Sequence, residues 1–239
     1  MVDRLSAFAA NGTAYRTLGE KAYGTLHEAI VAGALRPGER LPIEDLAAAT
    51  RMSPMPIREA LRRLESVGLV ELIPHRGARV AEISVEDLKE IYDWRLRLEV
   101  PAIGQAAGEF TEADATLAGD WLTRLGAAVE EGDDAAASEA HMRLHFTLYR
   151  AESSRLLHRL VSPLWDSAER YLVATRAARP LLKSRVDEHQ EMLDACRGQE
   201  AERAESLLSA YLVRMANAIS IEMTGSDLYA GRATAARST

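Results

Sequence analysis

Closely spaced turn signals in the first third of this chain constrain its fold more than any other feature. A segment that begins at Leu18 places apolar residues at helical spacing, and Pro37-Gly38 follows it as a turn. Residues 43–50 form a second, shorter segment with the same spacing. Ser53-Pro54 then supplies an N-cap and a first helical residue for a third segment. The sequence therefore predicts three consecutive helices.

A hairpin is predicted directly after these helices. Gly68 ends the third helix, and residues 69–73 and 78–83 are both short and compatible with β-strands. Between them lies the turn sequence Pro74-His75-Arg76-Gly77. The order helix, helix, turn, helix, hairpin predicts a winged helix-turn-helix over residues 18–83.

The remainder of the chain shows helical periodicity without further strand candidates of weight. Residues 1–17 are expected to be a flexible arm, residues 84–224 an all-helical ligand-sensing and dimerisation domain, and residues 225–239 a disordered tail. The fold class is therefore mainly α, a winged helix-turn-helix followed by an antiparallel helical bundle. Its six helical segments are predicted at 85–109, 112–131, 134–152, 154–177, 180–197 and 200–223.

Charge is distributed unevenly along the chain. The net charge is −7, yet residues 1–83 hold 11 Lys+Arg against 10 Asp+Glu, and the remaining residues hold 18 against 26. The first part, at +1, can still bind DNA if its arginines lie on one face. A single cysteine, no membrane-spanning apolar run and no signal-peptide pattern lead us to expect a cytoplasmic protein with no membrane partner.

The third helix and the hairpin turn carry the candidate DNA contacts. In a helix-turn-helix the second helix enters the major groove and presents its first residues to base edges. The wing turn offers a second contact with the adjacent minor groove. The same arginines also fit a merely solvated helix face. The predicted DNA-binding residues are Ser53, Met55, Arg58, Arg62, Arg63, His75, Arg76 and Gly77.

Residues 18–83 contain the stretches Leu35-Arg36-Pro37-Gly38-Glu39-Arg40-Leu41, Leu46-Ala47, Ser53-Pro54-Met55-Pro56-Ile57-Arg58-Glu59-Ala60-Leu61-Arg62-Arg63-Leu64-Glu65 and Gly68-Leu69-Val70. With these stretches, residues 18–83 closely resemble the GntR family of transcription regulators, and Pro74-His75-Arg76-Gly77 looks like that family's wing. The resemblance implies binding to a double-stranded DNA operator. Two arginines that the family commonly uses are replaced here by Pro54 and Glu44. The family's usual operator sequence is therefore not expected to transfer.

Three histidines in the helical part form a candidate metal site. His141 and His145 are four residues apart, so they lie on one face of a helix and can chelate one divalent ion. His189, on a later helix, can supply a third nitrogen. Zinc suits this set best, and nickel or another imidazole-binding ion also fits. The alternative is three histidines that bind no metal.

The helical part also resembles the FadR-type ligand-binding domain of one GntR subfamily. The carrying residues are Arg95-Leu96-Arg97-Leu98-Glu99, His141-Met142-Arg143-Leu144-His145-Phe146 and Glu188-His189. The resemblance implies a metal site in the bundle core, with His141 at the family's aspartate position and Tyr211 at its last histidine position. It also implies that Arg95, beside the metal, clamps a carboxylate effector. A surface ion pair between Arg95 and Glu99 is the alternative role.

These features together predict a DNA-binding transcription regulator that acts as a homodimer. A small anionic metabolite, a carboxylate in our interpretation, would bind at Arg95 and Tyr211 and control operator affinity. A metal-dependent enzyme with a three-histidine site is one alternative, but it needs a general base that the sequence does not show. An adaptor that has lost DNA binding is another, given Pro54 and Glu44.

Overall fold

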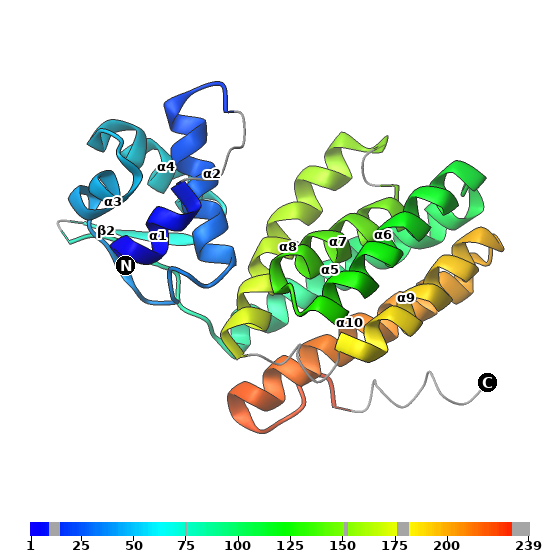
Figure 1. The fold of residues 1–239 in the computed structure, drawn as a ribbon. Coiled ribbons are helices and arrows are strands. Elements are labelled where there is room, and N and C mark those ends of the chain that lie inside the picture. The colour runs from blue at the N-terminus through cyan, green and yellow to red at the C-terminus, as the bar shows by residue number, and fades with distance from the viewer. Residues whose placement is uncertain (10–14, 75, 151–152, 176–181, 231–239) are drawn as a thin grey trace. The chain divides into compact units, whose positions relative to one another are not determined.

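A computed structural model describes residues 1–9, 15–74, 76–150, 153–175 and 182–230 of the chain (Figure 1). It divides into two compact units. The first comprises Met1–Ser84 with Glu169–Ala174, and the second comprises Val85–Ala168 with Thr175–Thr239. Each unit has its own core and is described by itself.

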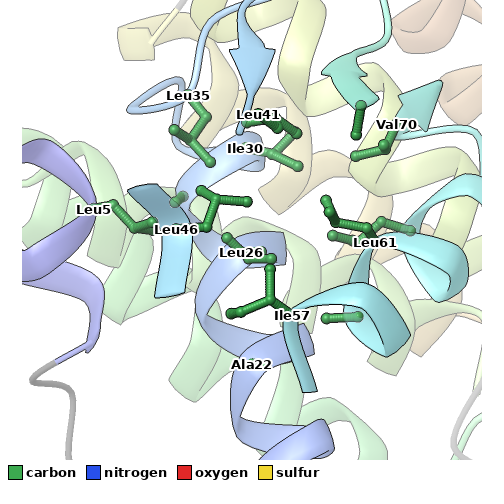
Figure 2. Close-up of a cluster of buried hydrophobic side chains, with 14 of the residues drawn as sticks. Leu5, Ala22, Leu26, Ile30, Leu35, Leu41, Leu46, Ile57, Leu61 and Val70 are labelled. Atoms are coloured by element: carbon green, nitrogen blue, oxygen red, sulfur yellow. The ribbon is translucent and has the colours of Figure 1, made fainter. Parts of the chain in front are cut away.

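The first unit is built on three helices, α2 (Leu18–Val31), α3 (Ile43–Thr50) and α4 (Pro54–Ser66). Their apolar stripes meet in one core, in which Leu26, Leu46 and Leu61 lie at the centre (Figure 2). Each of these leucines is at most 1% exposed. The predicted helix-turn-helix is present, and its periodicity is explained by this shared core.

The wing is a three-stranded antiparallel sheet in the order β1-β3-β2. The predicted hairpin forms β2 (Val70–Ile73) and β3 (Gly77–Val80), with Val70 opposite Val80 and Ile73 opposite Gly77. The prediction missed β1 (Arg40–Leu41), which pairs with the other side of β3. Two residues carry no periodic signal, so only the long-range pairing defines this strand.

The prediction of a flexible arm over residues 1–17 is wrong for its first part. Val2–Ala9 forms helix α1, which packs against α2 and α3. Leu5 is fully buried, and Arg4 donates to Glu39 Oε1 at 2.6 Å and to the carbonyl of Ala34. Eight residues are too few for a helical pattern to be distinguished from chance, and an isolated helix of this length is unstable without such packing. Residues 10–14 lie outside the described residues.

We expect Leu5→Ala to lower the free energy of unfolding by about 2–5 kcal/mol, because it removes a fully buried side chain and leaves a cavity. Val2→Ala, at a side chain that is 40% exposed on the same helix, is the matched control and should change it by less than about 0.5 kcal/mol. Urea unfolding followed by circular dichroism measures both. Equal values for the two variants would show that α1 does not contribute to the core.

Six helices follow Ser84 in the described part of the chain, and each was predicted from the sequence to within a few residues (Figure 1). Apart from Glu169–Ala174, they belong to the second unit. α5 packs extensively on α10, and α6 packs on both α7 and α9. Thr111 and Asp114 form a capping box at the start of α6, and Asp133 caps α7. The helices are α5 (Val85–Gly108), α6 (Glu112–Glu131), α7 (Asp134–Leu148), α8 (Arg155–Thr175), α9 (Leu182–Arg197) and α10 (Ala201–Thr224).

The predicted disordered tail is also wrong in its first residues. After α10 the chain turns back, and Tyr229 is buried. Its hydroxyl donates to Asp93 Oδ1 on α5 at 2.8 Å, and its N–H donates to Asn217 on α10. Residues 231–239 lie outside the described residues. No helix in the described part of the chain combines the length and apolar content needed to span a membrane.

Candidate functional site

Helix α4 carries four of the eight predicted DNA contacts, and three of them lie along its exposed face. Met55, Arg58 and Arg62 are all exposed, whereas Ile57 and Leu61 point into the core. Residues three and four apart are neighbours on a helix surface, so Met55, Arg58 and Arg62 form one continuous row. The row offers one apolar and two cationic side chains from the start of the helix onward.

Ser53 takes the N-cap position of α4, but it does not cap the helix through its side chain. Its backbone is extended, as the prediction requires, and Pro54 begins the helix. No side-chain capping hydrogen bond forms. One usual donor to such a cap is the N–H of the third helical residue, which is Pro56 here and has none. The exposed Ser53 hydroxyl is therefore not used to cap the helix.

Arg63 differs from the other arginines of α4. Its guanidinium carbon lies 4.2 Å from the centre of the Tyr23 ring on α2, a cation–π contact. With Tyr23, Gly24 and Glu20 it lines a shallow hollow. Its neighbours thus place it beside α2, a packing role that the sequence did not indicate.

The wing turn brings two of its three predicted contacts to the surface. Arg76 and Gly77 are exposed, and the N–H of Arg76 donates to the carbonyl of Ile73 to close the turn. Gly77 has φ 88°, a conformation that a residue with a side chain adopts only with strain. His75 lies outside the described residues.

The structure adds Arg51 to the candidate DNA surface. It lies in the turn between α3 and α4, is exposed, and adopts φ 56° in the left-handed region. The sequence did not predict this residue, because it lies in a turn outside the helix that begins after Ser53. A basic residue two positions before an N-cap serine was the available signal.

The three predicted metal ligands come together in the core of the second unit. His141 and His145 lie one turn apart on α7, and His189 reaches them from α9. The exposed fractions of these histidines are 3%, 0% and 0%, respectively. One ligand atom from each lies within 4.8 Å of the others, so the set is a compact group of nitrogens.

This group suits a divalent ion that prefers imidazole. His145 Nε2 and His189 Nε2 are 2.6 Å apart, with the two ring planes inclined at 72°. Two nitrogen ligands of a tetrahedral zinc ion lie ~3.3 Å apart, so a small opening of this pair accommodates an ion. The donor set and its closeness therefore fit zinc or a similar metal.

Tyr211, on α10, is a fourth buried side chain that lies against the three histidines. Its hydroxyl oxygen is 2.8 Å from His141 Nε2, and the side chain is buried. The structure thus brings Tyr211 to the histidines, as the resemblance implied for this position. A neutral phenol binds metal poorly, so its observed role is a hydrogen bond to His141.

Trp165 of α8 connects the histidines to a second buried polar group. Its ring centroid lies 5.0 Å from that of His141 and 4.9 Å from that of His145. The guanidinium carbon of Arg95 lies 4.4 Å from the Trp165 ring centre. The Trp165 ring therefore contacts both Arg95 and two histidines of the candidate metal site.

Arg95 and Glu99 form the ion pair that the sequence offered as an alternative, but the pair is buried rather than at the surface. Arg95 Nε donates to Glu99 Oε1 at 2.7 Å, and a second guanidinium nitrogen donates to Oε2 at 3.2 Å. The side chains are 4% and 0% exposed. Tyr149 and Trp165 also donate to Oε2, at 2.8 and 3.2 Å.

Electrostatics explain why the Arg95 guanidinium stays charged in the core. Burial alone disfavours the charged guanidinium, but the Glu99 carboxylate raises the pKa of Arg95 above its ordinary value. Burial and the same negative carboxylate raise the pKa of Tyr149 well above its ordinary value, so its hydroxyl stays protonated and donates.

Sequence reasoning missed Tyr149 and Trp165 as parts of this site. Tyr149 lies four residues after His145, one helical turn, and that spacing was a usable signal. Trp165 lies on a different helix from His141, so helical periodicity cannot predict that the two side chains are neighbours. Only the packing of α8 against α7 brings the two rings together.

Comparison with known families identifies both units. Residues 18–80 match the family described as bacterial regulatory proteins, gntR family. Residues 90–214 match the FCD domain, which covers more than half of the chain. The two matches follow one another along the chain: the first falls within the winged helix-turn-helix, and the second begins in α5 and ends in α10.

Similar proteins are transcription regulators. The chain is 32% identical over 133 residues to the HTH-type transcriptional regulator McbR of Escherichia coli, covering 56% of this chain and 60% of McbR. It is 27% identical over 213 residues to the HTH-type transcriptional repressor GlaR of the same organism, covering 85% and 96%. The solved structure of E. coli McbR/YncC matches with TM-score 0.75 and 26% identity over 88% of this chain and 99% of that one. A putative regulator from Rhodococcus sp. RHA1 matches with TM-score 0.73 and 26% identity over 84% and 96%.

Proposed function

This chain belongs to the gntR family of bacterial regulatory proteins and is a DNA-binding transcription regulator with an FCD ligand-binding domain, and we propose that a metal-assisted carboxylate site in that domain controls its affinity for an operator. The regulator would work in the cytoplasm, where operator DNA is reached. The observation that carries the proposal is the buried convergence of His141, His145 and His189.

The proposed metal is held by these three imidazoles. Bound there, a divalent ion supplies positive charge and open positions for the oxygens of a small anion. Tyr211 orients His141 through its hydrogen bond. The ligand set supports zinc first and nickel second.

Arg95 supports a carboxylate as the effector class. A guanidinium has five N–H donors, and its bonds to Glu99 use two of them. The remaining donors suit a planar carboxylate that is also drawn to the metal. Because Glu99 already neutralises Arg95, the effector's charge would be balanced chiefly by the ion.

The chemistry around the histidines favours a sensor over a hydrolytic enzyme. A metal hydrolase needs a carboxylate or similar base free to take a proton from bound water. Glu99, the carboxylate linked to this group through Trp165, accepts from Arg95, Tyr149 and Trp165. A carboxylate saturated in this way is a poor base. That the relatives are regulators supports the same assignment.

Selection from a random pool of duplex DNA by the full-length chain tests the DNA-binding half of the proposal. We propose a homodimer, since regulators of this type read two half-sites through two-fold symmetry. The enriched sequences should therefore contain two inverted half-sites. Enrichment of single, unpaired sites would contradict the dimer, and no enrichment would contradict sequence-specific binding.

Arg58→Ala should weaken binding to the selected duplex by about 1–3 kcal/mol if Arg58 reads a base. The exposed position of Arg58 on the first turns of α4 is the reason. If Arg58 contacts only a phosphate, affinity should fall equally for all sequences and the salt dependence should shrink by about one unit. Titrations at two salt concentrations separate the two roles, and unchanged affinity at both would exclude them.

A further inference from the structure

Met55 is the most exposed of the large apolar side chains in the described part of the chain, at 72%. It lies on the first turn of α4, where a DNA-reading helix presents side chains to base edges. A methionine exposed to this extent at that point contributes nothing to the core of the unit, whose α4 side is formed by Ile57, Ala60, Leu61 and Leu64.

Two prolines change what the first turn of α4 can offer to DNA. Pro54 and Pro56 flank Met55, and neither has an N–H. Helix starts commonly bind phosphate through their free N–H groups, and this start has lost two of them. The exposed surface of the turn is accordingly dominated by the Met55 side chain.

An apolar side chain that enters the major groove can contact the 5-methyl group of thymine. Thymine alone among the four bases carries a 5-methyl group there, and apolar contact with it distinguishes thymine from cytosine. Methionine is long, unbranched and polarizable, so it can follow a methyl group without exact preorganisation. Arg58, three residues on, lies beside Met55 on the same face and can bind the neighbouring base or phosphate.

We propose that Met55 is a specificity-determining residue that reads the methyl group of one thymine in each operator half-site. This inference rests on the proposed function, because it requires α4 to enter the major groove of a specific site.

Deoxyuridine provides the test, since it differs from thymidine only by the absent 5-methyl group. Duplexes selected by the wild-type chain are resynthesised with deoxyuridine at one thymine at a time, and affinities are measured by fluorescence anisotropy. One thymine per half-site should be sensitive, with a loss of about fourfold for one half-site and about fifteenfold for both, from the burial of one methyl group each. Thymines outside the half-sites are the internal control.

Met55→Ala links that loss to the side chain. This variant should bind thymine and deoxyuridine duplexes equally, whereas Met55→Leu should retain most of the discrimination. Because Met55 is exposed, both variants should unfold at the wild-type urea concentration. The inference is overturned if no thymine is sensitive with the wild-type chain, or if Met55→Ala keeps the full discrimination. Failure of the wild-type chain to enrich any sequence would overturn the proposed function together with this inference.

Discussion

His145→Ala is expected to lose its bound metal and its response to effector while its affinity for the selected duplex, measured without effector, stays within about twofold of wild type. His145 is fully buried between His141 and His189, so it supplies a central ligand of the proposed site. The DNA-reading residues belong to the other unit of the chain. Elemental analysis of the purified protein gives the metal content, and DNA titrations with and without small carboxylates give the response.

His158→Ala is the matched control. His158 lies on α8 in the same unit but is exposed and outside the group of three nitrogens. It should keep both the metal and the response. Full metal content in His145→Ala would show that the ligand assignment is wrong. Loss of metal with an unchanged effector response would show that the metal is structural and that the effector binds elsewhere.

Glu99→Ala should lower the free energy of unfolding by about 3–5 kcal/mol, because it leaves the Arg95 guanidinium buried without its counter-charge. The same change removes the carboxylate that accepts from the Tyr149 hydroxyl and is one of two acceptors of the Trp165 indole N–H. Replacing both partners, as in Arg95→Met with Glu99→Leu, should restore part of the stability, since an apolar pair avoids the cost of burying charge but still leaves the Tyr149 hydroxyl without its carboxylate acceptor. Urea unfolding of the three proteins measures these differences.

Glu139→Ala serves as the control for a pair of equal spacing on the surface. Glu139 and Arg143 lie at 4.0 Å on α7 with side chains 64% and 44% exposed. Loss of this exposed ion pair in Glu139→Ala should change the free energy of unfolding by at most about 0.5 kcal/mol. If Glu99→Ala were no more destabilising than Glu139→Ala, the core of the helical unit would be open to water at Arg95.

The sequence predicted the elements whose signals are local. Six helices after Ser84 have apolar periodicity and clear breaks such as Thr111 and Gly132, and the structure confirms them. The elements it missed owe their existence to distant partners. β1 is held by β3, and α1 by the core of α2 and α3. The turn at Tyr229 is held by Asp93 and Asn217.

The residues of the candidate sites also divide into those with a local sequence signal and those that depend on long-range packing. The spacing of His141 and His145 follows from one helix, and the family resemblance pointed to His189 and Tyr211. The burial of Arg95 with Glu99, and the contact of Trp165 with both groups, depend on how α5, α7 and α8 pack. The missing side-chain cap at Ser53 could have been predicted from the sequence, because Pro56 at the third helical position has no N–H to donate.

Effector control of DNA affinity is tested most directly by one titration. The wild-type chain, loaded with zinc, is titrated against its selected duplex in the absence and presence of a panel of small mono- and dicarboxylates. At least one carboxylate should change the dissociation constant by about 5- to 150-fold, the range of typical allosteric coupling. A dissociation constant that no carboxylate changes, in a protein shown to hold zinc, would contradict the account.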